Sequence, residues 1–191
     1  SEIEIFENIN LNIKKYEHTV LTGPNGSGKS TLLGLSAGLL YPQSGKVTCF
    51  SDKFGYVGVT PLIIAGTLRE NLLYGNDNEI NDSVLLDYLE KFKVFNESLV
   101  GSLDKNVNNK TLSSGQLQKI SFIRVLLSEV EVLLLDESTS NLDETSKNLI
   151  FKILKDSKLT ILNCTHNHED FNYDSHYKIS IENEKRLISL N

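Results

Sequence analysis

A glycine-rich loop between a buried strand and an apolar helix is the feature that most constrains the fold of this chain. Residues 18–22 (HTVLT) are typical of a buried β-strand, and residues 31–40 (TLLGLSAGLL) are typical of an apolar helix that ends before Pro42. The intervening GPNGSGKST contains the pattern Gly-x-x-x-x-Gly-Lys-Ser. In this context the pattern predicts a phosphate-binding loop, or P-loop. A glycine turn that only caps a helix is the simpler alternative, and it explains less of the pattern.

The residue types of this loop suit the binding of a nucleotide. Glycines allow backbone N–H groups to turn toward phosphates, and Lys29 supplies a positive charge for the β- and γ-phosphates. The Ser30 hydroxyl is a candidate ligand of Mg²⁺. The predicted nucleotide contacts are Gly23, Pro24, Asn25, Gly26, Ser27, Gly28, Lys29, Ser30 and Thr31.

Further strands and helices alternate along the chain, which predicts an α/β fold with a mainly parallel sheet. Besides 18–22, we expect strands at 9–13, 44–50, 53–59, 130–137 and 158–165, a helix at about 143–155 and a final hairpin at about 176–190. Helical patterns from about 65 to 116 interrupt the alternation. We therefore expect a P-loop core formed by residues 1–64 and 117–191, with a helical subdomain at 65–116.

Three side chains at the ends of predicted strands are candidates for catalysis. Asp136 and Glu137 end the apolar strand VEVLLLDE, where α/β proteins place ligand groups. Asp136 suits Mg²⁺, and Glu137 suits a water that attacks the γ-phosphate, although a lone acid there can simply be solvated. His166 follows the next strand and suits the γ-phosphate or the water. The pattern HNH at 166–168 is weak evidence for zinc.

A second helix start has the sequence of an anion site. Ser113 and Gln116 have the spacing of a capping box, and a helix N-terminus attracts anions. This start lies about eighty residues after the P-loop in the sequence, so a P-loop alone does not account for it. A box that only starts a helix is the alternative.

Composition excludes several classes of protein. The net charge of −6 gives no electrostatic footprint for nucleic acid. No apolar run reaches the ~20 residues of a membrane-spanning helix, and the two cysteines lack a CxxC pattern. These features predict a soluble chain in the cytoplasm. The absence of Met suggests a piece of a longer protein, with a processed N-terminus as the alternative.

Together these motifs resemble the nucleotide-binding domain of ABC (ATP-binding cassette) ATPases. GPNGSGKST resembles Walker A, LSSGQ at 112–116 the signature, VLLLDE Walker B, SNLD at 140–143 the D-loop, and Thr165-His166 the switch histidine. The resemblance implies a RecA-like P-loop NTPase core that binds ATP and Mg²⁺. It implies Glu137 as general base, His166 and Lys29 as catalytic contacts, and Ser30 with Asp136 as Mg²⁺ ligands.

The resemblance also explains the second helix start, because two cassettes of this family pack head to tail. It implies that Ser113, Ser114, Gly115, Gln116 and Asp143 contact ATP held by the P-loop of a second cassette, most simply a second copy. AGTLRENLLYG at 65–75 is similar to exporter-type cassettes. We therefore expect an ATPase on the cytoplasmic face of a membrane that powers export, with the transmembrane domain outside this chain.

Three departures from the family pattern have consequences. Val59 stands where the Q-loop carries a glutamine, and a valine neither ligates Mg²⁺ nor orients water. The sequence begins at the second strand region of the family, so the aromatic residue that stacks on adenine is expected to be missing. Ser114 replaces the first glycine of LSGGQ, which we expect to be tolerated because Gly115 is kept.

Two other functions remain open from the sequence. A soluble ABC ATPase of ribosomes or DNA fits the motifs, but the segment between P-loop and signature leaves no room for sustained heptads. The acidic charge also disfavours it. A small-molecule P-loop kinase explains Lys29 and leaves LSSGQ and SNLD unused.

Overall fold

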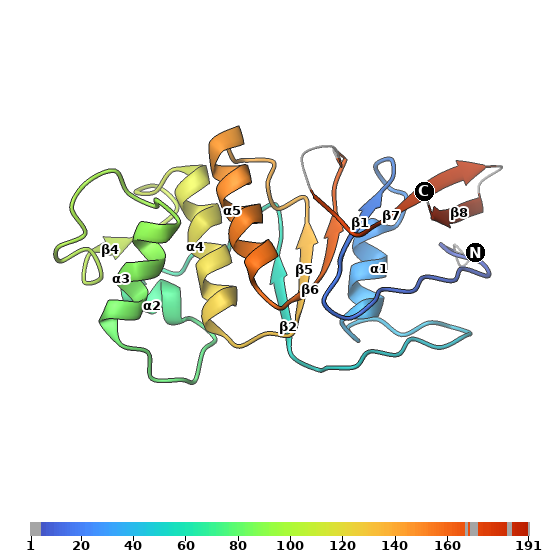
Figure 1. Cartoon of the computed structure of the whole chain (residues 1–191), viewed down its shortest axis with the longest axis horizontal. Coiled ribbons are helices and arrows are strands. Elements are labelled where there is room, and N and C mark those ends of the chain that lie inside the picture. Colours follow the sequence, from blue (N-terminus) through green and yellow to red (C-terminus); the bar gives the residue numbers. More distant parts are fainter. Residues whose placement is uncertain (1–4, 167, 169–171, 183–184, 191) are drawn as a thin grey trace. The chain divides into compact units, whose positions relative to one another are not determined.

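The computed structural model describes residues 5–166, 168, 172–182 and 185–190. Figure 1 shows its helices and strands along the chain. They are β1 (His18–Thr22), α1 (Lys29–Ser36), β2 (Phe54–Val57), β3 (Gly66–Thr67), α2 (Leu68–Leu73), α3 (Asp82–Lys91), β4 (Asn106–Val107), α4 (Ser114–Leu127), β5 (Val132–Asp136), α5 (Glu144–Asp156), β6 (Thr160–Cys164), β7 (Ser175–Glu182) and β8 (Lys185–Leu190).

A six-stranded sheet has the strand order β2-β5-β6-β1-β7-β8. The pairs β5–β6, β6–β1 and β1–β7 are parallel, and only the final hairpin β7–β8 among these registered pairs is antiparallel. This confirms the predicted mainly parallel α/β fold. The register places Leu21 of β1 and Asp136 of β5 opposite the same residue, Cys164 of β6. Residues that follow β1, β5 and β6 therefore emerge at one edge of the sheet.

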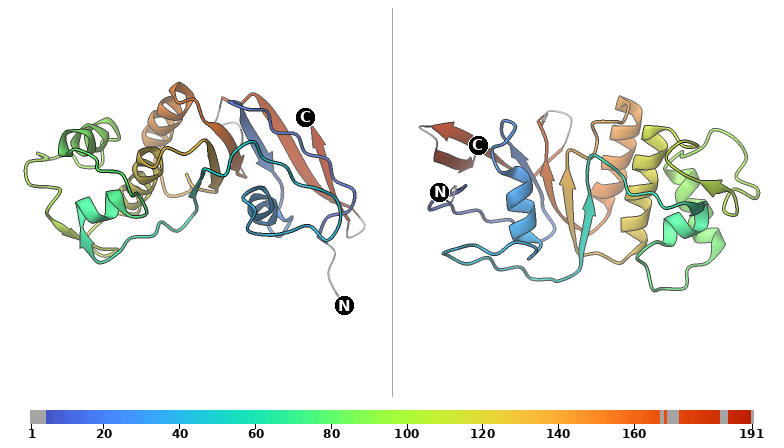
Figure 2. Two further views of the ribbon diagram at one scale, coloured as in Figure 1. Left: turned by 90° about the horizontal axis from the view of Figure 1, so that it is seen from below. Right: turned by 180° about the vertical axis from the view of Figure 1, so that it is seen from behind.

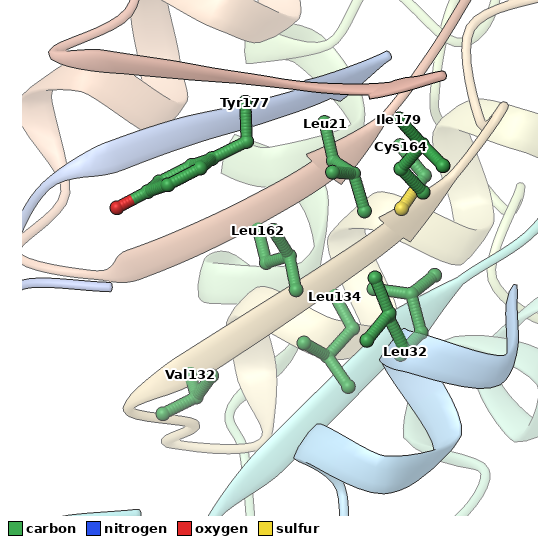
Figure 3. Close-up of a cluster of buried hydrophobic side chains, with 9 residues drawn as sticks. Leu21, Leu32, Val132, Leu134, Leu162, Cys164, Tyr177 and Ile179 are labelled. Atoms are coloured by element: carbon green, nitrogen blue, oxygen red, sulfur yellow. The ribbon is translucent and has the colours of Figure 1, made fainter. Parts of the chain in front are cut away.

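An apolar cluster lies between helix α1 and the sheet. Figure 3 shows Leu32 of α1 facing Leu134 and Leu162, which come from the neighbouring strands β5 and β6. The helix lies against one face of the sheet in both views of Figure 2. Each of these leucines is at most 4% exposed, so burial of their side chains is a main source of stability for this part of the fold. Because α1 starts at Lys29, the same packing fixes the P-loop.

The chain divides into two compact units. The first comprises residues 1–56, 131–137 and 154–191, and the second comprises residues 57–130 and 138–153. The second unit contains a two-stranded antiparallel sheet, β3–β4, and helix α4 with α2 and α3 packed against it. Its fully buried side chains include Leu72, Leu85, Leu89, Phe92, Ile120 and Ile123. The helical subdomain expected at 65–116 falls within this unit, and its boundaries stay a prediction.

Two predicted strands are wrong. Residues 9–13 form no strand, although Ile9, Leu11 and Ile13 pack partly buried against the core of the first unit. Their alternation therefore reflects an extended segment that buries side chains without forming a hydrogen-bonded ladder. Residues 44–50 also form no strand, and all of them are exposed. Because its apolar side chains are not buried, this segment gains no stability from forming a strand.

Helix α1 is shorter than its apolar sequence suggests, because it ends at Ser36. Gly38 takes a left-handed conformation with φ 71° and stops the helix. Among the helices that the structure describes, none combines the length and the apolar character needed to cross a lipid bilayer.

We expect Leu134→Ala to lower the free energy of unfolding by about 3 kcal/mol, because it leaves a cavity beside Leu32 and Leu162. Equilibrium urea denaturation followed by circular dichroism measures the change. Leu39→Ala is the control, because Leu39 is 78% exposed, and its effect should stay within about 0.5 kcal/mol. Equal effects of the two substitutions would contradict this account of the core.

Candidate active site

The P-loop joins the carboxyl end of β1 to the start of α1. Its last glycine, Gly28, is the N-cap of the helix and has φ 97°, and Gly26 has φ 74°. A Cβ atom at Gly28 would lie 2.5 Å from Cζ of Phe6, whereas one at Gly26 would meet nothing within 4 Å. Backbone conformation therefore favours glycine at both positions, and a side chain at position 28 would in addition displace the ring of Phe6.

Lys29 lies across the loop that precedes it. Its Nζ donates to the carbonyl oxygens of Gly23 (2.9 Å) and Pro24 (3.2 Å), and the side chain is only 6% exposed. The Ser27 side chain beneath the loop is fully buried, and its hydroxyl has no hydrogen-bond partner among the described residues. The ammonium group is thus held at the loop, where a polyphosphate would meet it.

Glu137 connects the loop to the switch histidine. Its carboxylate Oε1 lies 2.7 Å from Nε2 of His166 and 3.8 Å from Nζ of Lys29. The backbone of Glu137 is left-handed, with φ 50°, and its N–H donates to the carbonyl oxygen of Cys164 at 2.9 Å. A left-handed glutamate is strained, and such strain is common at functional sites. The structure therefore brings together the three residues predicted to be catalytic.

Asp136 and Ser30 form a second contact beside the loop. The Ser30 hydroxyl donates to Oδ2 of Asp136 at 2.7 Å, and the Tyr56 hydroxyl donates to the same oxygen at 3.4 Å. Burial, followed by the nearby Asp136 carboxylate, raises the pKa of Tyr56, so this hydroxyl stays protonated near neutral pH. A hydroxyl and a carboxylate beside a phosphate loop are the oxygen ligands that suit Mg²⁺. These residues therefore fit the ion that the sequence predicts.

A pocket of about 300 Å³ opens beside these residues. Its lining consists of Ile5, Asn25, Gly26, Ser27, Gly28, Lys29, Ser30, Thr31, Glu137 and Arg186. Most of the predicted P-loop contacts therefore border one cavity, together with the predicted general base.

The histidines near this edge of the sheet contact different partners instead of forming a zinc site. His166 pairs with Glu137, whereas the His168 ring stacks on His176 at 4.4 Å between centroids. Nε2 of His176 lies 2.7 Å from the Thr22 hydroxyl, and burial lowers the pKa of this imidazole. Asn167, between the two histidines of the HNH pattern, lies outside the described residues. Within the described part of the chain, no three metal-binding side chains gather.

The predicted signature residues belong to the second unit and start helix α4. The Ser113 hydroxyl accepts from the N–H of Gln116 at 3.2 Å, and the Gln116 side chain accepts from the N–H of Ser113 at 2.8 Å. The capping box that the sequence predicts is thus present. Ser113 and Ser114 are exposed. A Cβ atom at Gly115 would make only ordinary contacts, at 3.8 Å or more, so packing within the unit does not require a glycine there.

Two further predicted positions lie in the second unit. The Asp143 carboxylate accepts from the N–H and the hydroxyl of Ser146, at 2.8 and 2.9 Å, just before α5. These hydrogen bonds, the backbone one first, lower the pKa of Asp143. Val59 is 43% exposed, and its carbonyl oxygen accepts from the Asn141 side chain at 3.1 Å. Its position is therefore held through the backbone, while its side chain offers no metal ligand.

Comparison with known proteins identifies the family. Residues 6–140 match the family model described as ABC transporter. The chain belongs to the ABC transporter family. Membership in this family implies that the chain binds ATP.

The chain covers very different shares of two of its relatives. It is 35% identical over 188 residues to the ATP-dependent permease MDL1 of Candida albicans, covering 86% of this chain but 27% of that protein. It is 32% identical to the probable iron export ATP-binding protein FetA of Escherichia coli K12, covering 90% of this chain and 82% of that protein. The chain thus spans about a quarter of MDL1 and most of FetA.

A solved structure has the same fold as this chain. The structure of a bacterial Atm1-family ABC exporter with ATP bound matches 96% of this chain and 35% of that chain, with a TM-score of 0.82 and 19% identity. At this identity the match concerns the fold alone, and it agrees with the ABC transporter assignment.

Two residues near the P-loop of this ABC transporter chain were missed by sequence reasoning. Tyr56 reaches Asp136 because strands β2 and β5 are neighbours in the sheet, an order that the sequence does not reveal. Arg186 reaches the pocket from β8, a hundred and sixty residues beyond Gly26 in the chain. A pattern search on this single sequence offers no signal for either residue.

We expect Gly28→Ala to weaken ATP binding and to lower the free energy of unfolding more than Gly26→Ala does. Both substitutions put a side chain on a left-handed backbone, at about 1 kcal/mol each, but only the methyl group at position 28 meets Phe6. Calorimetric titration with ATP and urea denaturation measure the two effects. Equal behaviour of the two variants would show that the contact with Phe6 does not constrain the loop.

Proposed function

We propose that this chain is an ATP-binding and ATP-hydrolysing cassette that powers a membrane exporter as one member of a head-to-tail pair. The observation that carries the proposal is the position of the Glu137 carboxylate beside the P-loop, 2.7 Å from His166 and 3.8 Å from Lys29. A carboxylate base and a positive charge that line one pocket, with an imidazole in contact with the base, are groups that suit phosphoryl transfer to water.

Glu137 acts as the general base in this proposal. Its carboxylate accepts the proton of a water whose oxygen attacks the γ-phosphorus, while the bond to the β–γ bridging oxygen breaks and ADP leaves. Lys29 stabilises the negative charge of the phosphates, and His166 orients the Glu137 carboxylate and the transferred phosphoryl group. The left-handed backbone of Glu137 sets the direction of its side chain toward the pocket.

Ser30 and Asp136 would hold Mg²⁺, directly or through water. When bound, the ion neutralises phosphate charge and fixes the orientation of the β- and γ-phosphates. The 2.7 Å contact between the Ser30 hydroxyl and the Asp136 carboxylate supports this role, because it shows that both oxygens reach one point beside the loop.

A second cassette completes the site in this proposal. The γ-phosphate of ATP on the P-loop of the partner would be bound by the signature residues Ser113, Ser114, Gly115 and Gln116. Asp143 would lie at the same interface between the two cassettes. Exposure of Ser113 and Ser114 at the start of a 14-residue helix supports this role. The glycine at 115, which the packing of its own unit does not require, also supports it.

Export is the transport direction that the relatives support. The two relatives are named an ATP-dependent permease and a probable iron export ATP-binding protein. We therefore place this cassette at the cytoplasmic face of a membrane, in association with a transmembrane domain that lies outside these 191 residues.

The test is Mg²⁺-dependent ATP hydrolysis by the chain and by Glu137→Gln. We expect the substitution to lower kcat at least about 100-fold, because a general base contributes roughly that much, while ATP still binds. The matched control is Glu131→Gln, since Glu131 directly precedes β5 just as Glu137 directly follows it. The control should keep its activity. Unchanged turnover in Glu137→Gln would refute the assignment of the base.

A further inference from the structure

The guanidinium group of Arg186 joins two segments at the border of the P-loop pocket. Its Nη2 donates to the carbonyl oxygen of Gly26 at 3.2 Å, and its Nη1 donates to that of Ile5 at 3.4 Å. Both accepting residues and Arg186 itself line the pocket. Arg186 belongs to strand β8, which pairs with β7 so that Arg186 lies opposite Ile181. The sheet therefore fixes the backbone position of the arginine.

The charges around the pocket leave Arg186 available to an anion. Lys29 is the other cation of the lining, and it lies 3.8 Å from the Glu137 carboxylate. No carboxylate among the described residues lies within ion-pair distance of Arg186. Its two carbonyl contacts use one hydrogen of each terminal nitrogen, so a second hydrogen remains on each.

We propose that Arg186 is a second phosphate-binding cation of this pocket, acting on the phosphate chain of the nucleotide from the side of Gly26. The proposal rests on the proposed function of the pocket as an ATP site. A guanidinium is always charged and presents its donors in a planar fork that matches phosphate oxygens. Its contact with the Gly26 carbonyl places that fork on the loop whose backbone N–H groups face the phosphates.

This arrangement divides the work between two cations. Lys29 is 6% exposed and lies between the loop carbonyls and the general base, which suits the reacting end of the nucleotide. Arg186 is half-buried and touches the tip of the loop, where its charge contributes to binding rather than to the chemical step. Loss of Arg186 should therefore weaken nucleotide affinity and leave the turnover of bound ATP largely unchanged.

The experiment compares the affinities of the wild-type chain, Arg186→Gln and Arg186→Lys for ATP and for inorganic tripolyphosphate, by calorimetric titration in Mg²⁺ buffer. We expect Arg186→Gln to lower the affinity for both ligands by about tenfold or more, as the loss of a charge-assisted hydrogen bond does. The deficit should shrink at high salt. Arg186→Lys keeps the charge but lacks the planar fork, so it should bind tripolyphosphate more weakly than wild type and more tightly than Arg186→Gln at low salt.

Lys178→Gln is the matched control. It removes one positive charge from the same hairpin, at an exposed position that is not part of the pocket lining, and should leave both affinities unchanged. If Lys178→Gln lost as much affinity for tripolyphosphate as Arg186→Gln does, the net charge of the chain rather than the Arg186 contact would explain the binding. That result would overturn the proposal.

Three results would also overturn the proposal. Arg186→Gln could bind both ligands as tightly as wild type does. It could also lose affinity for ATP alone, which would mean that Arg186 contacts the nucleoside rather than the phosphates. If Arg186→Gln does not fold, binding of tripolyphosphate by folded Arg186→Lys as tight as that of the wild type would mean that the guanidinium fork of Arg186 does not contact the phosphates. Failure of the proposed function looks different, because wild type and Lys29→Ala would then bind ATP equally poorly.

Discussion

The contact of Glu137 with His166 and Lys29 is the interaction on which the candidate site depends. It exists because β1, β5 and β6 are parallel neighbours, with Leu21 and Asp136 paired to the same residue, Cys164. The N–H of Glu137 then bonds to the carbonyl oxygen of Cys164 and holds a left-handed backbone that is strained by about 1–2 kcal/mol. The packing of α1 on β5 and β6 places Nζ of Lys29 3.8 Å from the same carboxylate oxygen, Oε1, that contacts His166. Sheet register and helix packing thus fix the chemistry together.

The second unit presents groups that its own packing does not use. Ser113 and Ser114 are exposed at the start of α4, and Gly115 has room for a side chain. The capping box satisfies the first N–H groups of this helix from within the chain, and it keeps the helix start ordered. An ordered, exposed helix start of this kind is suited to an anion brought by another molecule. The proposed pairing of cassettes gives these residues a ligand.

Much of the fold and of the site could be predicted from this one sequence, because the informative residues are close together in the chain. GPNGSGKST, the end of VEVLLLDE and the Ser113–Gln116 box each carry their own local geometry, and the parallel sheet follows from the alternation of elements. The alternation of apolar and polar residues at 9–13 led to the wrong prediction of a strand. Ile9, Leu11 and Ile13 instead bury their side chains from an extended segment that forms no hydrogen-bonded ladder with another strand. Tyr56 and Arg186 could not be found, since strand order and a returning hairpin bring them to the loop. The nucleotide contacts of Ser113 and Asp143 stay predictions.

The central claim is that one ATP site needs the P-loop of one copy and the signature of another. Its most direct test is a mixing experiment with Lys29→Ala, which disables the P-loop, and Gly115→Asp, which adds a negative charge at a position with room for a Cβ atom. Each variant alone should show no Mg²⁺-dependent ATP hydrolysis. An equimolar mixture should recover up to about a quarter of wild-type activity, because half of the pairs are mixed and each mixed pair has one intact site. A mixture as inactive as its components, or full activity in Gly115→Asp alone, would contradict the account.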